Sequence, residues 1–176
     1  MAINYIFIDL DETLISTVYP APKQEHISFV LGTPPLQYFS IIHPRALDII
    51  EFSRNLVGYN NVYILTIATK DYAIKVNELA KFRFEEDHIL HRQTVTTHWS
   101  STAYGGGVTY PCVLADKKNV LIDNLPWNYN TNKIDLIGIH KDRYFQCNDF
   151  YGEAYIDDTF FEDATEFLTR LHNEQQ

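Results

Sequence analysis

Two aspartates stand one residue apart directly after the first apolar run of the chain. Asp9 and Asp11 follow residues 3–8, a run that only Asn4 interrupts. Alternate residues of an extended chain share a face, so both carboxylates point the same way. Two such carboxylates repel each other unless a cation or a proton is present, and Mg²⁺ prefers oxygen ligands and bridges carboxylates to phosphate. One carboxylate could then attack phosphorus while the other transfers the proton.

Acid pairs are common in solvated loops, but two further apolar runs here also end in polar residues. Residues 62–65 lead to Thr66, whose hydroxyl, together with the following N–H of Ile67, can hold a phosphate oxygen. Residues 119–123 end in the carboxylate of Asp123, which can complete a Mg²⁺ shell. Ligands bind at the carboxyl ends of the strands in an open α/β sheet. We therefore expect these polar side chains and the acid pair to form one site.

A site of this kind also needs a cation that neutralises the phosphoryl charge. Lys117 and Lys118 lie just before the third apolar run, and alternation makes it improbable that both face the phosphate. We assign the role to Lys118, with Lys117 nearly as suitable. The alternative is an exposed turn with two solvated cations, in which case Arg92 is a further candidate.

The elements expected to position these residues alternate between strands and helices. The predicted strands are residues 3–8, 62–65, 119–123 and 134–139, and the predicted helices are 44–57, 71–81 and one that begins at Thr159 with Glu162 completing a capping box. This alternation is typical of the α/β class, with a mainly parallel sheet. Residues 16–43 are predicted to form a β-hairpin flap, and the glycine-rich residues 92–115 a loop insertion.

Length and composition favour one globular domain, residues 1–176. A net charge of −9 argues against non-specific nucleic-acid binding, because such affinity depends on Lys and Arg. The amino terminus does not resemble a signal peptide, and no apolar run approaches the roughly 18–20 residues of a membrane span. Cys112 and Cys147 form no CxxC pair, so reduced thiols are expected. These features favour a cytoplasmic protein.

The order of acid pair, strand-end hydroxyl, lysine and strand-end acid resembles the haloacid dehalogenase (HAD) superfamily of phosphotransferases. The greatest likeness is to the FCP/SCP-type (NLI-interacting-factor-like) phosphatases, which act on the phosphorylated tail of RNA polymerase II. Residues 9–14 are similar to their first motif, 65–73 to their second and 122–126 to their fourth, while 38–52 resemble the segment after their first hairpin. The likeness covers about residues 3–127.

This resemblance implies a Rossmann-like HAD fold without a large cap domain, Mg²⁺ as the cofactor and an aspartyl-phosphate intermediate. Asp9 is then the nucleophile and a metal ligand, and Asp11 is the acid/base that lends its backbone carbonyl to the metal. Asp123 is also a metal ligand. The remaining site residues are expected to bind the phosphate or the substrate: Thr13, Thr66, Ile67 and Asn124. In the FCP/SCP group the lysine lies further upstream of the fourth motif, where this chain has its glycine-rich insertion.

We expect a Mg²⁺-dependent phosphohydrolase that cleaves phosphomonoesters on a macromolecule. Neither insertion is long enough for a separate cap domain, and an open site favours a phosphoprotein or a nucleic-acid end. One alternative is a nucleotide phosphatase in which Tyr38, Trp99 or Tyr104 contacts the base. The other is a binding module without turnover, which the intact acid pair argues against. His88, His91 and His98 could suggest zinc, but no cysteine pair accompanies them.

Overall fold

The main body of the molecule is a parallel sheet of five strands in the order β6-β5-β1-β7-β8. The computed structural model describes residues 3–95, 114–152 and 159–174. The strands are β1 (Ile6–Ile8), β5 (Val62–Leu65), β6 (Ile89–Leu90), β7 (Val120–Asp123) and β8 (Tyr144–Gln146). The three central strands are buried throughout, as expected for a parallel sheet that is covered on both faces. The predictions of α/β class and of these three strands are confirmed.

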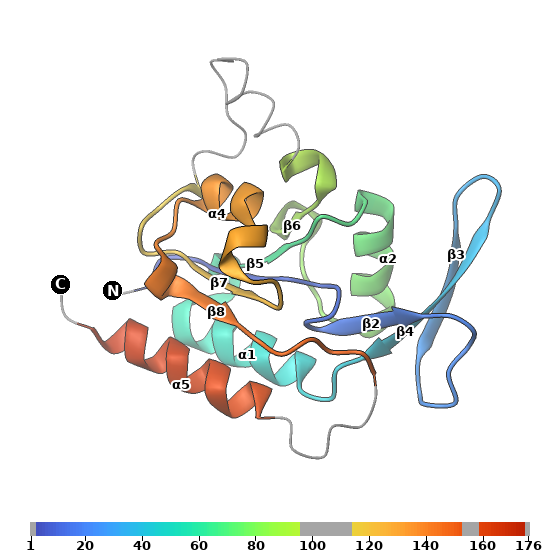
Figure 1. Cartoon of the computed structure of the whole chain (residues 1–176), viewed down its shortest axis with the longest axis horizontal. Coiled ribbons are helices and arrows are strands. Elements are labelled where there is room, and N and C mark those ends of the chain that lie inside the picture. The colour runs from blue at the N-terminus through green and yellow to red at the C-terminus, as the bar shows by residue number, and fades with distance from the viewer. Residues whose placement is uncertain (1–2, 96–113, 153–158, 175–176) are drawn as a thin grey trace.

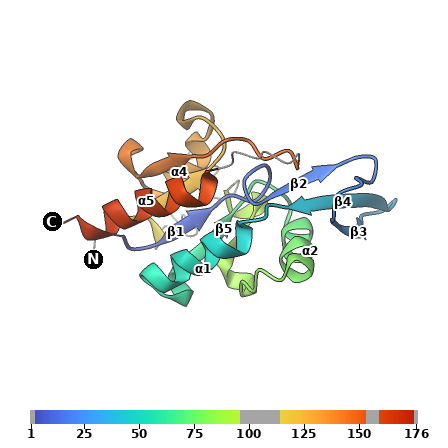
Figure 2. The same cartoon turned by 90° about the horizontal axis from the view of Figure 1, so that it is seen from below.

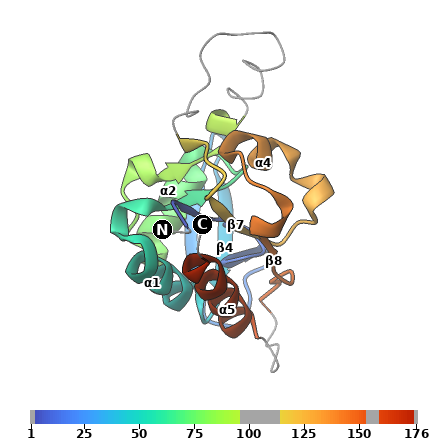
Figure 3. The same cartoon turned by 90° about the vertical axis from the view of Figure 1, so that its left-hand side faces the viewer.

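Helices cover both faces of this sheet (Figures 1 and 3). On one face, Ile6 and Ile8 pack in a core shared with α1 (Ala46–Val57), α2 (Lys70–Ala80) and α5 (Phe160–Asn173). On the other face, Phe7 packs with α4 (Thr131–Ile137). Short 3-10 turns are η1 (Tyr59–Asn61), η2 (Glu86–His88), η4 (Trp127–Tyr129) and η5 (Lys141–Arg143). No helix in the described ranges is long and apolar enough to cross a membrane.

The helix ends agree with the sequence in all but one respect. Helix α1 ends at Gly58, whose φ of 101° lies in a region that glycine adopts without strain. Helix α5 begins directly after Thr159, but the predicted capping box is wrong. The Thr159 hydroxyl donates to the carboxylate of Asp163 at 2.7 Å instead of accepting a backbone N–H.

Residues 134–139 do not form the predicted fourth strand. They lie mostly in α4, which ends at Gly138 in the left-handed conformation, with the Gly138 N–H donating to the Ile134 carbonyl at 2.9 Å. A short apolar run cannot be assigned to strand or helix by periodicity alone, and the glycine after it is a helix-ending signal. The other two strands of the sheet are instead β6 and β8, neither of which was predicted.

A small antiparallel sheet follows the acid pair and projects from the body (Figures 1 and 2). It contains β2 (Ile15–Val18), β3 (Ile27–Leu31) and β4 (Leu36–Ile42), in the order β2-β4-β3. The β3–β4 hairpin turns at residues 32–35, as the Gly-Thr-Pro-Pro sequence predicts, and β2 adds a third strand. Most of the predicted insertion at 92–115 lies outside the described residues, as does Cys112.

Candidate active site

A tight turn after β1 carries the acid pair. The N–H of Asp9 donates to the Ile122 carbonyl at 2.9 Å, which fixes the nucleophile candidate beside β7. The chain then turns back on itself, with the Leu14 N–H donating to the Leu10 carbonyl at 2.9 Å and Glu12 at a φ of 62°. A non-glycine residue in this region is strained by roughly 1 kcal/mol, and such strain is frequent at functional sites.

Asp9, Asp123 and Lys133 form a buried ion cluster at the carboxyl end of the sheet. The strand register pairs Ile8 with Ile122, so Asp9 and Asp123 emerge side by side. The Lys133 ammonium lies between them, 2.8 Å from Asp9 Oδ1 and 2.8 Å from Asp123 Oδ2. Lys133 is 2 % exposed, and it reaches the acids from α4. No residue of this cluster is solvated, so its charges act on one another and on whatever enters the site.

When Asp9 is ionised, the cluster carries one more negative charge than its single ammonium can neutralise. Burial raises the pKa of Asp9 to about 7, and Asp123 adds to the rise while Lys133 opposes it. Burial alone would lower the pKa of Lys133, but the charges of Asp9 and Asp123 outweigh it and the pKa is raised. Lys133 therefore remains a protonated, positively charged ammonium. The excess charge of two carboxylates over one ammonium is a reason for a further cation to bind here.

Thr13 and Asn124 are buried beside the Asp9 carboxylate. The Thr13 hydroxyl donates to Asp9 Oδ2 at 3.0 Å and lies 3.3 Å from Asn124 Oδ1, while Asn124 Nδ2 donates to Asp149 at 2.8 Å. The buried thiol of Cys147 lies 3.7 Å from the Thr13 hydroxyl. These contacts hold the Asp9 carboxylate in one orientation. Thr13 and Asn124, which are predicted to bind substrate, are thus buried and placed to orient the Asp9 carboxylate.

Thr66 ends β5 at the same edge of the sheet as the acids. It is buried, and its Oγ1 accepts the N–H of Ala68 at 3.0 Å, which leaves the hydroxyl proton for another acceptor. Ile67 follows it in the loop, and its carbonyl accepts from Arg92 Nε at 2.8 Å. The alternative cation, Arg92, therefore lies against the loop that follows Thr66.

Asp11 contacts the helix on the flap side. Its Oδ1 accepts from the Tyr72 hydroxyl of α2 at 2.6 Å. Burial raises the pKa of Asp11, whereas the Tyr72 hydrogen bond and the Lys133 charge act in the opposite direction. Burial and the neighbouring Asp11 raise the pKa of Tyr72, so this phenol remains a donor. A carboxyl group with a raised pKa is better suited to exchanging protons with a substrate than an ordinary exposed carboxylate is.

The assignment of the cation to Lys118 or Lys117 is contradicted by the structure. Both line a surface pocket at the start of β7, and the Lys118 carbonyl accepts the Asn4 N–H at the beginning of the chain. Asp123 lies five positions after Lys118, roughly 16 Å along the extended strand, which a lysine side chain does not span. Lys133 supplies the ammonium instead. The sequence contains one indication of this role. Lys133 precedes Leu136 by three positions and Ile137 by four, which in a helix places the lysine on the same buried face as these two apolar residues.

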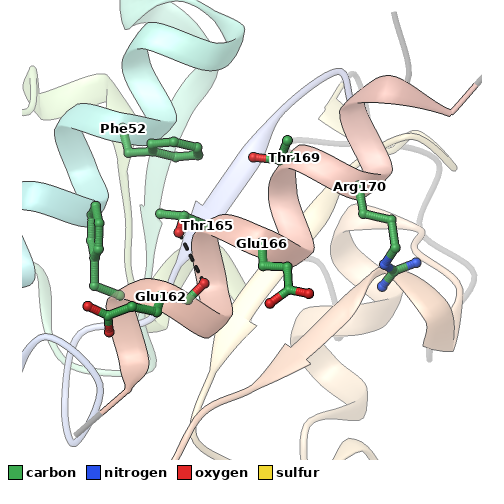
Figure 4. Close-up of a pocket in the computed structure, with 7 residues that line it drawn as sticks. Phe52, Glu162, Thr165, Glu166, Thr169 and Arg170 are labelled. Atoms are coloured by element: carbon green, nitrogen blue, oxygen red, sulfur yellow. Dashed lines mark hydrogen bonds between the residues drawn. The ribbon is translucent and has the colours of Figure 1, made fainter.

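Other candidate groups lie apart from this cluster. His88 stacks on Tyr63 at 4.4 Å, and its Nε2 lies 2.9 Å from the Asn60 carbonyl, so it has a structural role; His98 lies outside the described residues. A surface hollow between α1 and α5 is lined by Phe52, Thr165 and Arg170 among others (Figure 4). Asp9, Asp11, Asp123 and Lys133 do not line that hollow.

The donor set fits a hard divalent cation. Mg²⁺ is usually held by one or two carboxylates together with substrate phosphate and water, not by a cage of side chains. In the described ranges, no group of three or more His, Cys, Asp or Glu could hold a metal. Mg²⁺ needs only one or two carboxylates, and Asp9 and Asp123, whose negative charge is not fully compensated, provide them.

The central strand β1 of the parallel sheet is followed by the acid pair, and a small antiparallel sheet is inserted directly behind that pair, which agrees with the HAD-type phosphatase fold that the sequence motifs predict. Within this class, the chain belongs to the NLI interacting factor-like phosphatase family, whose family model matches residues 4–176. No curated protein matches the chain by sequence.

Solved structures of an RNA polymerase II CTD phosphatase share the fold. One is a variant of the fission yeast RNA polymerase II CTD phosphatase Fcp1 bound to beryllium fluoride, with 17% identity and a TM-score of 0.57, covering 97% of this chain and 51% of that one. The other is a structure of Fcp1, described as an essential RNA polymerase II CTD phosphatase, with 17% identity and a TM-score of 0.57, covering 97% of this chain and 49% of that one. The chain thus spans about half the length of these relatives.

Proposed function

We propose that this protein is a Mg²⁺-dependent phosphohydrolase that cleaves phosphomonoesters through an aspartyl-phosphate on Asp9. The observation that carries the proposal is the buried Asp9 carboxylate, oriented by Thr13 on one oxygen and by Lys133 on the other. A carboxylate held by two donors at the end of a strand has lost its freedom to turn away from an incoming phosphorus atom. Such positioning supplies much of the rate in phosphoryl transfer.

The reaction follows from the roles of the acid pair. An Asp9 oxygen attacks phosphorus while the bond from phosphorus to the leaving-group oxygen breaks, and Asp11 gives its proton to that oxygen. Asp11 then takes a proton from water as the water oxygen attacks the same phosphorus, which releases phosphate and restores Asp9. Lys133 donates to two acids in the described part of the chain and has a third N–H for a phosphate oxygen. The Thr66 hydroxyl is proposed to donate to a second phosphate oxygen.

Mg²⁺ would be held by the carboxylates of Asp9 and Asp123 and by the backbone carbonyl of Asp11. When bound, it supplies positive charge that neutralises the phosphoryl oxygens. The excess negative charge of the buried cluster supports this assignment, because a bound cation would reduce the electrostatic repulsion between the two buried carboxylates.

Mg²⁺ should therefore stabilise the protein in the absence of any substrate. At about 100 times the dissociation constant, a ligand that binds only the folded state adds about 2.7 kcal/mol to the free energy of unfolding. We expect Tm to rise when Mg²⁺ replaces a chelator, and Asp123→Asn to remove most of the rise. An equal Tm in both conditions, or a rise that survives Asp123→Asn, would place the cation elsewhere or exclude it.

The substrate is proposed to be a phosphoprotein. The Fcp1 relatives are named as phosphatases of the RNA polymerase II CTD, a protein substrate. The flap behind the acid pair is only a three-stranded sheet, too small to form a separate cap domain, which favours a macromolecular substrate. With a net charge of −9, a phosphopeptide is favoured over a phosphorylated nucleic-acid end.

An open site predicts that rate depends on the body of the substrate. Remote binding energy orients the reacting group, so a phosphoserine peptide should exceed p-nitrophenyl phosphate in kcat/KM by roughly tenfold or more. The comparison should include a 5′-phosphorylated oligonucleotide and free nucleoside monophosphates at the same Mg²⁺ concentration. If nucleoside monophosphates are the best substrates, the protein is a nucleotide phosphatase, and if none is hydrolysed it only binds phosphorylated ligands.

A further inference from the structure

A line of hydroxyl groups leads from the flap to the acid/base candidate. Ser40 of β4 and Thr17 of β2 are direct partners across the small sheet, and their oxygens lie 2.6 Å apart. The Thr17 oxygen lies 2.5 Å from the hydroxyl of Tyr72, which in turn donates to Asp11 Oδ1 at 2.6 Å. Three elements that are distant in sequence thus meet in one hydrogen-bonded chain that ends on Asp11.

The direction of this chain follows from proton counting, because each hydroxyl has one proton. The Tyr72 proton goes to Asp11, so the Tyr72 oxygen must accept the proton of Thr17. Thr17 has then used its own proton and must accept from Ser40. All three hydroxyls therefore donate towards Asp11, and the line has one orientation when Asp11 is a carboxylate.

Aromatic packing holds the tyrosine in place. Tyr72 is 8 % exposed, and its ring packs against Phe29 at 5.8 Å and Tyr38 at 5.6 Å, both from the flap. The ring cannot swing away from Asp11 without opening this packing. The hydroxyl is consequently a fixed donor, and the flap determines where it points.

We propose that Tyr72 is the positioning residue for the acid/base, and that it assigns proton transfer to Oδ2 of Asp11. Oδ1 is engaged by Tyr72, so the exchangeable proton resides on Oδ2. That proton passes to the leaving-group oxygen as the bond to phosphorus breaks, and the water that follows returns a proton to Oδ2. Tyr72 keeps its own proton throughout. This inference rests on the proposed phosphatase function and adds to it the residue that orients the acid.

The test is the effect of Tyr72→Phe on two substrates that differ in leaving group. An alkyl oxygen, as in a phosphoserine peptide, needs a proton in order to leave, whereas p-nitrophenolate leaves without one. We expect kcat/KM to fall by roughly 10–100-fold for the peptide, part of the 10²–10⁴-fold that acid–base catalysis contributes, and by less than about threefold for p-nitrophenyl phosphate. The ratio kcat/KM is used because it reports the first phosphoryl transfer without the later hydrolysis.

Two further variants separate positioning from folding. Thr17→Val removes the hydroxyl that donates to Tyr72. It should lower kcat/KM for the peptide and not for p-nitrophenyl phosphate, by a smaller factor than Tyr72→Phe does. Tyr63→Phe removes the hydroxyl of a buried tyrosine in the central sheet and should change neither substrate. Equal losses for both substrates in Tyr72→Phe and Thr17→Val, or no loss for the peptide, would overturn the inference alone. A wild-type protein that hydrolyses neither substrate would instead overturn the proposed function and this inference together.

Discussion

Asp9→Asn should lower kcat by at least ~10³-fold and leave the protein no less stable than the wild type. The amide is not a nucleophile towards phosphorus, and removal of a nucleophile costs factors of this size or larger. The same change removes the excess negative charge of the buried cluster. Because the pKa of Asp9 is raised to about 7, the folded protein holds this proton more tightly than the unfolded chain does. The free energy of unfolding of the metal-free wild type should thus fall as the pH rises from about 4 towards 7.

Above pH 7, in a chelator, Asp9→Asn should therefore have a Tm equal to or above that of the wild type. Phosphate release and thermal unfolding of the same preparations measure both effects. Asp48→Asn, on the exposed side of α1, is the matched control and should change neither. Activity close to wild type in Asp9→Asn would exclude Asp9 as the nucleophile, and a large drop in Tm would mean that its charge stabilises the fold.

Lys133→Met should lower both activity and stability. Without the ammonium, Asp9 and Asp123 are left buried with no cation between them, and removing one partner of a buried ion pair costs about 3–5 kcal/mol. The phosphoryl group also loses a donor, so we expect kcat/KM to fall by ~10²–10³-fold. Denaturant unfolding should show a greater loss in a chelator than in Mg²⁺, because the divalent cation offsets part of the missing charge.

Lys118→Met is the control for this prediction, since Lys118 lies at the opposite end of β7. We expect less than a twofold change in kcat/KM and a surface-sized change in stability, within about 0.5 kcal/mol. Similar losses in the two variants would contradict the role given to Lys133. So would a Lys133→Met enzyme that keeps its rate.

The central strands and the acids at their ends could be predicted from the sequence because each signal is local. Continuous apolar runs such as residues 62–65 are distinctive, and topology then brings their carboxyl ends together. The hairpin was predicted from its Gly-Pro turn. Strands β6 and β8 were missed because runs of two and three residues carry too little periodicity to be recognised.

Lys133 was missed because its role depends on an element that was assigned to the wrong class. If residues 134–139 formed a strand, Lys133 would only precede the apolar run, and nothing would mark it as a site residue. In helix α4 it shares a face with Ile137 and points into the sheet edge. Tyr72 was missed for a different reason, since only the tertiary fold brings it to Asp11, 61 residues away in sequence. No local pattern marks a tyrosine hydroxyl as a donor to a distant carboxylate.

The central claim is the covalent intermediate on Asp9, and hydroxylamine trapping during turnover tests it most directly. Hydroxylamine attacks the carbonyl carbon of an acyl phosphate, releases phosphate and leaves a hydroxamate on the side chain, which accumulates even when the intermediate is short-lived. We predict that wild-type protein, incubated with Mg²⁺, phosphopeptide and hydroxylamine, loses activity with time and carries the hydroxamate on the peptide that contains Asp9. Omission of the phosphopeptide should prevent both changes. Sustained turnover in hydroxylamine with no modification of Asp9, or a hydroxamate on another carboxylate, would contradict the account.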